Sequence, residues 1–118
     1  MGFGRIVHCA AEYHDKKIAY TSQLAHIVSN AYVKSGTADG YAGFTGGSFQ
    51  DMTRIAGVDE KVWTRLYFLN KENILSELRT LIVHLEEYAD CLNKGEETDL
   101  YRLLREGRMR KEELDQQR

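Results

Sequence analysis

The hydrophobic positions between residues 11 and 34 repeat with the period of an amphipathic helix. Apolar side chains recur at spacings of seven, three and four, at Ile18, Ala25, Val28 and Tyr32. The wide apolar face leaves a narrow polar stripe, made of Ser22, His26, Ser29 and Asn30. Such a pattern predicts a helix that buries most of its circumference.

A second, longer helical pattern begins near Asp59 and runs to about Asn93. Its seam is spaced mostly by three and four, at Val62, Leu66, Leu69, Asn73, Leu78, Leu81, Leu85, Tyr88 and Leu92. A seam of this kind is typical of a helix that packs against another helix, in a bundle or in a dimer. The pair Asn70 and Asn73 interrupts it, which predicts a kink or a buried polar contact.

The remaining segments are shorter and more irregular. Residues 35–47 hold five glycines and predict a loop. A short helix is expected next, with Ser48 as N-cap and Gly57 at its end. We expect Gly95 to end the long helix and Thr98 to cap one more short helix through Leu104.

The two ends of the chain differ in character. The opening segment GFGRIVHC predicts a short strand, because Ile6 and Val7 are β-branched. A lone strand needs a partner for its edge, in this domain or in another one. Residues 107–118 predict a solvated charged tail of mixed sign.

Composition supports an all-α domain and excludes several classes. The 118 residues include no proline, the residue that most disrupts helix interiors. A net charge of −2 offers no basic field for nucleic acid or for an anionic membrane surface, and no apolar run reaches membrane-spanning length. With two cysteines, Cys9 and Cys91, there is no disulfide framework, which fits a reducing cytoplasm.

Two residues on predicted helices could carry chemistry. His26 lies mid-helix, where it is either a residue on a hydrated face or a donor that lines a cleft for an anionic ligand. Arg54 follows the glycine-rich loop with Asp51 at i−3. The two form either an ordinary helix pair or a guanidinium fork that Asp51 holds toward a carboxylate.

The loop before Arg54 and the lone tryptophan belong to the same region. The glycines of GFTGGSF would let backbone N–H groups approach an anion, although glycine-rich connections are common. Trp63 is either simple core packing or a wall of the same pocket.

No metal site has clear support in the sequence. No CxxC or HExxH motif is present, and GFGRIV lacks the third glycine of a dinucleotide fingerprint. The adjacent pair His14 and Asp15 raises the alternative of a metal-dependent helical phosphohydrolase. That site would need more ligands, such as His8 and Asp90 or Asp99, and no second spaced pair exists.

Three segments taken together resemble the C-terminal domain of prephenate dehydrogenases. They are HDKKIAYTSQLAH, GGSFQDMTRIAGVDEKVW and LYFLNKENI. Members of that family carry an HD pair, a Ser-x-x-x-His helix, a Gly-Gly-x-Phe-x-Asp-x-Thr-Arg-Ile-Ala segment, a Trp and an Asn in this order. The matching residues here are His14, Asp15, Ser22, His26, Gly46 through Ala56, Trp63 and Asn70. The chain departs from many members at Gln23, Ala25 and Ser48, where they have His, Pro and Gly.

The resemblance implies an all-helical, homodimeric, cytoplasmic domain that closes one side of an active-site cleft. The parent enzyme would oxidatively decarboxylate prephenate to 4-hydroxyphenylpyruvate with NAD (or NADP) in tyrosine biosynthesis, or act on arogenate or another cyclohexadienyl substrate. Substrate-binding residues would be His26, Arg54, Gly47, Trp63 and Ser22, with Asp51, His14, Asp15 and Asn70 in support.

On this basis the chain divides into three parts. Residues 1–10 would be the last strand and linker of an N-terminal NAD-binding Rossmann domain, 11–106 the helical dimerisation domain, and 107–118 the tail. The family's nucleotide fingerprint and catalytic residues belong to that other domain, so we expect these residues to bind no cofactor and to be inactive alone. The alternative is a free-standing helical module that only dimerises.

Overall fold

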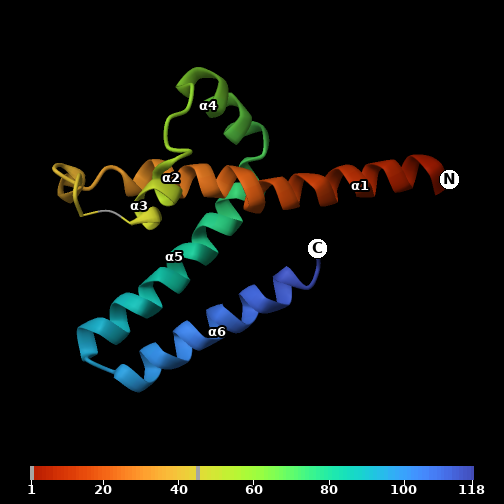
Figure 1. Cartoon of the computed structure of the whole chain (residues 1–118). Helices are drawn as coiled ribbons and strands as arrows, with labels where there is room; N and C mark the ends of the chain where they lie inside the picture. The colour runs from red at the N-terminus through yellow and green to blue at the C-terminus, as the bar shows by residue number, and fades with distance from the viewer. Residues whose placement is uncertain (1, 45) are drawn as a thin grey trace. The chain divides into compact units, whose positions relative to one another are not determined.

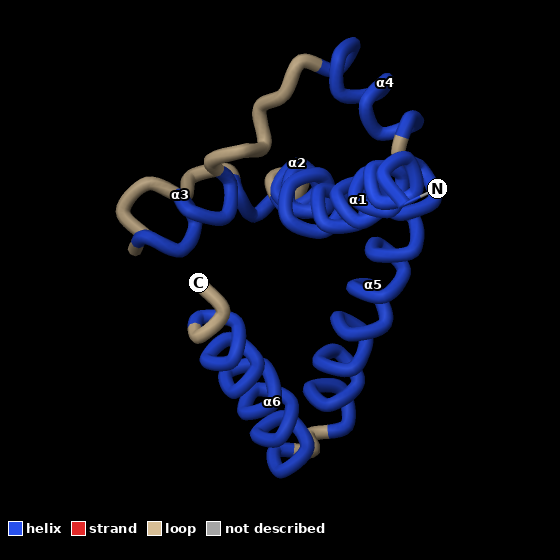
Figure 2. The backbone as a smooth tube through the Cα atoms, turned by 90° about the vertical axis from the view of Figure 1, so that its right-hand side faces the viewer, coloured by secondary structure: helices blue, strands red, loops and turns tan. Residues whose placement is uncertain are grey.

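The computed structural model describes the chain over residues 2–44 and 46–118, with side chains from residue 10 onward. Every regular element in these ranges is helical (Figures 1 and 2), which confirms the all-α class. In chain order they are α1 (Gly2–Ile18), η1 (Ala19–Leu24), α2 (Ala25–Tyr32), η2 (Gly36–Ala38), α3 (Gly47–Thr53), α4 (Glu60–Leu69), α5 (Lys71–Lys94) and α6 (Glu97–Asp115). They form two compact units, residues 1–78 and 79–118.

The first unit is organised around a long helical rod made of α1, η1 and α2 (Figure 1). The flanking residues Ile18 and Ala25 keep helical dihedral angles, so the chain does not bend out of helix at either join. The middle segment η1 is π-helical, a wider form whose hydrogen bonds run from i to i+5. The helix expected between residues 11 and 34 is therefore present, with a π segment that the periodicity did not predict.

The prediction of a strand at the start of the chain is wrong, because residues from Gly2 onward belong to α1. The β preference of residues such as Ile6 and Val7 is worth less than ~1 kcal/mol per residue and depends on a partner strand. A helix satisfies its own backbone groups, and extending an existing one costs far less than nucleating another. Continuation of α1 therefore outweighs the local preference of two residues.

The glycine-rich segment is a loop, as predicted, with the short 3₁₀ turn η2 inside it. Gly40 and Gly43 adopt φ values of 75° and 91°, which side chains with a Cβ rarely tolerate. The following helix α3 begins two residues earlier than expected. Its N-cap is Gly46 rather than Ser48, and it ends at Thr53 rather than near Gly57.

The long helix predicted between residues 59 and 93 is two helices, α4 and α5. Asp59 caps α4 by accepting hydrogen bonds from the backbone N–H groups of Lys61 and Val62. The break falls at Asn70, whose φ of −119° and ψ of 27° leave the helical region. The interruption that the two asparagines predicted is thus a real kink.

The second unit consists of the later part of α5 and of α6. Gly95, with a φ of 69°, ends α5 as predicted. The Tyr88 hydroxyl donates to the carbonyl of Leu103 over 3.4 Å and so ties the two helices together. The helix predicted to end at Leu104 continues to Asp115, because the charged residues of the tail form ion pairs one turn apart, such as Arg108 with Glu112 and Lys111 with Asp115.

The hydrophobic core within these units is small. The apolar residues that are buried are Ala19, Leu24, Ile74 and Leu103. Much of the predicted seam is open to solvent, including Val62, Leu66, Leu69, Leu85 and Leu92, of which Leu69 is 83% exposed. None of the helices in the described ranges has the length and apolar character needed to cross a membrane.

Candidate functional site

His26 and Trp63 form an aromatic stack in the first unit. The centroids of the two rings lie 4.3 Å apart with an angle of 28° between their planes. His26 comes from the first turn of α2 and Trp63 from α4, and both side chains are half-buried. Tyr67 meets the Trp63 ring edge-on at 5.7 Å, and burial raises the pKa of its phenol. The sequence predicted both members of the stack as site residues, and the structure brings them together.

The hydrogen bond of His26 defines which ring nitrogen is available. Nδ1 lies 2.7 Å from the carbonyl oxygen of Ser22. Because a carbonyl oxygen can only accept, Nδ1 carries the proton and Nε2 is left to meet a ligand. Ser22 thus orients His26 through its backbone carbonyl, and a role of its side chain in binding a substrate stays a prediction. Its carbonyl belongs to the π segment, whose irregular geometry gives a side chain access to a backbone acceptor.

Arg54 is held close to α2 through the backbone on either side of it. The Ser29 hydroxyl donates to the carbonyl of Met52 over 2.7 Å, and the Asn30 side-chain amide donates to the carbonyl of Ala56 over 3.0 Å. Both donors follow His26 by about one turn of α2. Arg54 itself is exposed, and within the described residues its guanidinium makes no ion pair or hydrogen bond. It is therefore available as a cation beside the helix that carries His26.

The expected pairing of Asp51 with Arg54 is not formed among the described residues. Asp51 is exposed, and its carboxylate lies near the start of α3 instead. A Cβ placed on Gly47 would be 3.8 Å from Asp51 Oδ2. An acid in the first turns of a helix is favoured by the N–H groups there. A role for Asp51 in orienting Arg54 stays a prediction.

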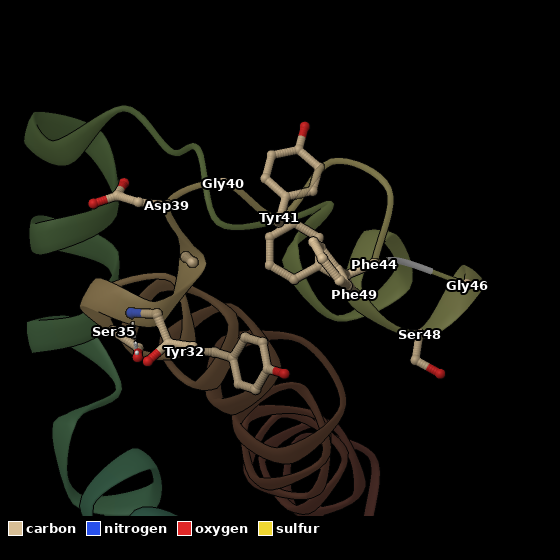
Figure 3. A pocket seen from close by; sticks show the side chains of 11 residues that line it. Tyr32, Ser35, Asp39, Gly40, Tyr41, Phe44, Gly46, Ser48 and Phe49 are labelled. Carbon is tan, nitrogen blue, oxygen red and sulfur yellow. Dashed lines mark hydrogen bonds between the residues drawn. The ribbon is translucent and has the colours of Figure 1, made fainter.

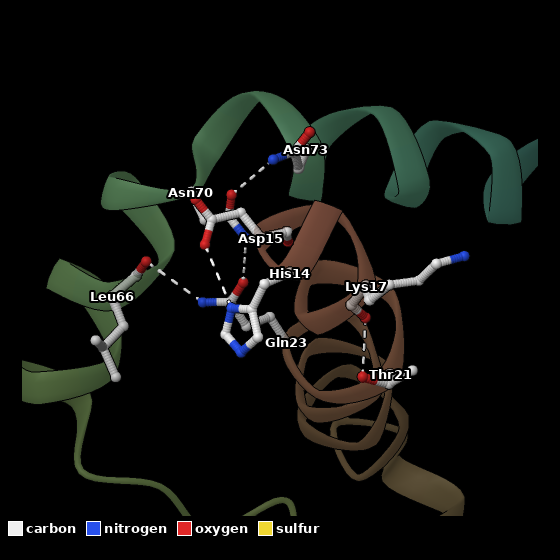
Figure 4. Close-up of polar contacts among 8 residues, drawn as sticks. All are labelled: His14, Asp15, Lys17, Thr21, Gln23, Leu66, Asn70 and Asn73. Atoms are coloured by element: carbon white, nitrogen blue, oxygen red, sulfur yellow. Dashed lines mark hydrogen bonds and ion pairs between the residues drawn. The ribbon is translucent and has the colours of Figure 1, made fainter. Parts of the chain in front are cut away.

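Asn70 is the centre of a polar network at the kink between α4 and α5 (Figure 4). Its Nδ2 donates to the carbonyl of Asp15 over 2.9 Å and to Gln23 Oε1 over 2.7 Å. Its Oδ1 accepts from the side chain of Asn73 over 2.8 Å. The predicted polar contact between the two asparagines is confirmed. The bonds from Asn70 to Asp15 and Gln23 link the kink to the helical rod.

The sequence analysis did not predict that two polar residues of the rod, Gln23 and Ser29, are buried. Gln23 is 8% exposed and Ser29 is 2% exposed. Both hydrogen-bond to other segments of the chain, Gln23 to α4 and to the kink and Ser29 to α3. A signal was present for Gln23, because it stands between apolar residues on the buried side of the helix. Ser29 was placed on a polar stripe, which the structure turns toward the protein.

The pair His14 and Asp15 lies on α1, away from this stack in sequence and open to solvent. His14 Nδ1 and Asp15 Oδ1 are 3.6 Å apart, and the two side chains are 71% and 62% exposed. Asp15 reaches the network through its backbone carbonyl. Over the residues described, no three His, Cys, Asp or Glu side chains gather as metal ligands. The structure thus offers no support for the phosphohydrolase alternative.

A separate cavity of about 810 Å³ lies between the end of α2, the glycine-rich loop and the start of α3 (Figure 3). Its walls are aromatic, with Tyr41 stacked on Phe49 at 4.7 Å and Tyr32 and Phe44 nearby. The charged residue among its lining is Asp39. Since a carboxylate disfavours an anionic ligand, we centre the candidate site on His26, Trp63 and Arg54, none of which lines this cavity.

One known protein family matches most of this chain, including the residues of the candidate site. Residues 10–106 match the family model described as the dimerization domain of prephenate dehydrogenase. The chain belongs to this family. The match includes the stack, Arg54 and the Asn70 network, and it confirms the family that the ordered motifs indicated.

Individual relatives of this dimerization domain agree. The chain is 33% identical to a cyclohexadienyl dehydrogenase of Zymomonas mobilis over 92 residues, which cover 71% of the chain and 31% of the relative. It is 30% identical to a prephenate dehydrogenase of Lactococcus lactis over 105 residues, which cover 83% of the chain and 29% of the relative. The chain therefore spans about a third of the length of these curated relatives.

A solved structure shows the same fold. The crystal structure of an arogenate dehydrogenase from Synechocystis superimposes with a TM-score of 0.75 at 23% sequence identity. The match covers 86% of this chain and 39% of that one. The fold described here thus corresponds to a part of the longer chain of that structure.

Proposed function

We propose that this chain supplies the dimerisation and substrate-binding part of a dehydrogenase that oxidatively decarboxylates prephenate to 4-hydroxyphenylpyruvate in tyrosine biosynthesis. The observation that carries the proposal is the His26–Trp63 stack beside the anchored Arg54 segment, in a chain of this family. Arogenate is the closely related alternative substrate. The two cysteines and the free thiol of Cys91 fit the cytoplasm, where we place the protein.

The proposed substrate is a dianion, and the cationic and hydrogen-bonding groups of the site suit its charge. Arg54 would hold one carboxylate with two parallel N–H donors, an arrangement that lysine cannot offer. His26, with Nδ1 committed to Ser22, would present Nε2–H to a second anionic oxygen when protonated. Trp63 fixes the plane of the imidazole and supplies an apolar wall. Gly47 would let backbone N–H groups at the start of α3 approach the ligand.

The chemistry of the reaction requires a hydride acceptor, which NAD or NADP would supply while the ring carboxylate leaves as carbon dioxide. The described residues do not fit a dinucleotide. Such cofactors bind at the carboxyl ends of parallel strands, and residues 2–44 and 46–118 hold only helices. We therefore expect no NAD reduction from prephenate by these 118 residues alone, and we infer that a Rossmann domain completes the enzyme.

Substrate binding tests the proposal directly. Trp63 is the sole tryptophan of the sequence, so its fluorescence reports on the site. We expect prephenate to change this fluorescence in a saturable way. In Arg54→Ala the affinity should fall about 10- to 100-fold, because a charged hydrogen bond contributes about 1.5–3 kcal/mol. Arg105→Ala, which removes an exposed arginine from α6, is the matched control and should bind as the unaltered chain does.

The competing function is a helical module that only dimerises, and the exposed seam along α4 and α5 favours it as the second candidate. Such a module would dimerise yet leave the Trp63 fluorescence unchanged with prephenate, 4-hydroxyphenylpyruvate and tyrosine. Equal prephenate affinity in Arg54→Ala and the unaltered chain would show that Arg54 does not bind the substrate.

A further inference from the structure

Gln23 makes contacts at both ends of its side-chain amide although it is almost fully buried. Its Nε2 donates to the carbonyl of Leu66 in α4 over 3.4 Å. Its Oε1 accepts from Asn70 Nδ2 at the kink over 2.7 Å. With 8% of its surface exposed, this amide would be costly to bury without these partners. Gln23 is thus a polar link between the π segment of the rod and the end of α4.

The helix α4 depends on side chains for its position. Among the described helices, α3 packs closely against α2, whereas α4 lies beside the rod with fewer close backbone contacts (Figure 1). The described contacts that attach it are the Trp63 ring on His26, the bond that Gln23 donates to Leu66, and the bonds that Asn70, at the end of α4, donates to Gln23 and to the carbonyl of Asp15. Leu66 follows Trp63 by three residues, about one helical turn. A change at Gln23 therefore reaches the aromatic stack through a single turn of α4.

We propose that Gln23, supported by Asn70, is a positioning residue that holds Trp63 on His26 and so fixes the orientation of the imidazole toward the ligand. The inference deepens the function proposed above and rests on it for its ligand. The hydrogen bonds of Gln23 go to Leu66 and Asn70 and not to either ring of the stack. Gln23 acts through α4, on one side of His26, while the carbonyl of Ser22 in the same π segment fixes His26 Nδ1 from the other.

The stack can be observed in the chain without any ligand. The carbon-bound ring protons of His26 lie against an indole face and should resonate upfield of those of the exposed His14 and His84. Their signals are identified as those missing from a His26→Gln variant. In Gln23→Met, which has similar length but no amide, we expect them to move most of the way to the positions of an exposed histidine. Gln117→Met, an exposed glutamine near the end of the chain, should leave them unchanged.

Stability and positioning are separated by this measurement. A Gln23→Met variant that unfolds at a lower temperature yet keeps the His26 signals in place would overturn the proposal. If Gln23→Met does not fold, Gln23→Glu takes its place, because it keeps the acceptor for Asn70, removes the donor to Leu66 and sets a carboxyl group against the Leu66 carbonyl. We expect a partial shift of the His26 signals in that variant, and unchanged signals in the folded protein would equally overturn the proposal.

The ligand gives a second readout that is independent of the first. Prephenate affinity should fall by about tenfold or more in the variant with the displaced stack, since small misplacements of a binding group are costly. Displaced signals with unchanged affinity would overturn the functional half of the inference. If the unaltered chain binds no prephenate, the proposed function fails, while the NMR signals still decide whether Gln23 positions the stack.

Discussion

Ser29 ties the segment before Arg54 to the helix that carries His26. It is a small residue with 2% of its surface exposed, and its hydroxyl donates to the carbonyl of Met52 over 2.7 Å. Asn30 adds a second bond, to the carbonyl of Ala56. The position of Arg54 therefore depends on the side chains of Ser29 and Asn30, which act on its backbone and not on a ligand.

Replacement of Ser29 by alanine tests this dependence. The change removes the donor to the Met52 carbonyl at a serine position that is itself buried, and we expect the free energy of unfolding to fall by about 1–3 kcal/mol. Urea unfolding followed by circular dichroism measures the loss. Ser48→Ala, at an exposed serine on α3, should change stability by less than ~0.5 kcal/mol. A Ser29→Ala protein as stable as the unaltered chain would show that water replaces the hydroxyl.

The sequence was informative for residues with distinctive chemistry and silent on those that support them. From the residues alone, His26 and Trp63 could be structural or functional, and the resemblance to the family made them site candidates. Ser29 was assigned to a polar stripe, because helical periodicity shows which residues share a face but not what covers that face. The polar stripe of this helix faces α3 and α4 rather than water.

The turn between α5 and α6 places two carboxyl groups in contact. Glu96 precedes α6 and Asp99 lies in its first turn. A hydrogen bond from Glu96 to Asp99, together with the negative charge of Asp99, raises the pKa of Glu96 above its ordinary value, and Lys94 opposes this only in part. The two groups share a proton at acid pH and repel each other once both are ionised.

A pH-dependent stability of this turn follows. A pKa that is raised in the folded state means that the pair stabilises the fold below the ordinary glutamate pKa of 4.5, and this contribution is lost as the pH rises through the folded-state pKa. Glu96→Gln should therefore melt at a higher temperature than the unaltered chain at about pH 7. Thermal unfolding from about pH 4 to about pH 7 measures the difference, which should vanish or reverse at the acid end.

The control for this experiment is Glu86→Gln, an exposed glutamate on α5. It removes the same charge without touching the pair, so its melting temperature should run parallel to that of the unaltered chain. If the melting temperature of Glu96→Gln differs from that of the unaltered chain by the same amount at every pH, the shared proton is contradicted.

Helices were predicted well where the hydrophobic repeat was long, and their ends were predicted where a glycine left no alternative, as at Gly95. The failures came where a local preference competed with a neighbouring helix. Ile6 and Val7 favour a strand by themselves, yet α1 continues through their part of the chain. The charged tail has only two hydrophobic residues, Met109 and Leu114, yet ion pairs one turn apart carry α6 to Asp115.

At the scale of the whole molecule, apolar surface exceeds what either unit covers by itself. The exposed residues of the seam include Val62, Leu66, Leu69, Leu85 and Leu92. Large apolar side chains exposed at helical spacing, as on α4 and on α5, are typical of an interface. The chain belongs to a family of dimerization domains, so we propose that a second copy covers the seam, as the sequence pattern predicted.

A charge placed on the seam should separate the copies. We expect the unaltered chain to sediment at twice the 13.6 kDa of one copy, and Leu85→Lys to sediment as a single copy or to unfold. Glu86→Lys introduces the same charge at the next, polar position and should keep the double mass. The melting temperature of the unaltered chain should also rise with protein concentration. A stable single copy at micromolar concentration, with a melting temperature independent of concentration, would refute the interface.

The π segment η1 sets the rotation of α2 relative to α1. The rod is continuous in its hydrogen bonding, but each residue of a regular helix advances by about 100°. A deletion of one residue within Ala19–Leu24 that restored regular geometry would keep the rod intact and turn its two ends against each other. The faces that bear Asp15 and His26 would then no longer meet Asn70 and Trp63 together. Substitutions along this helix can accumulate one at a time, whereas a change of length within η1 alters every contact between its two ends at once.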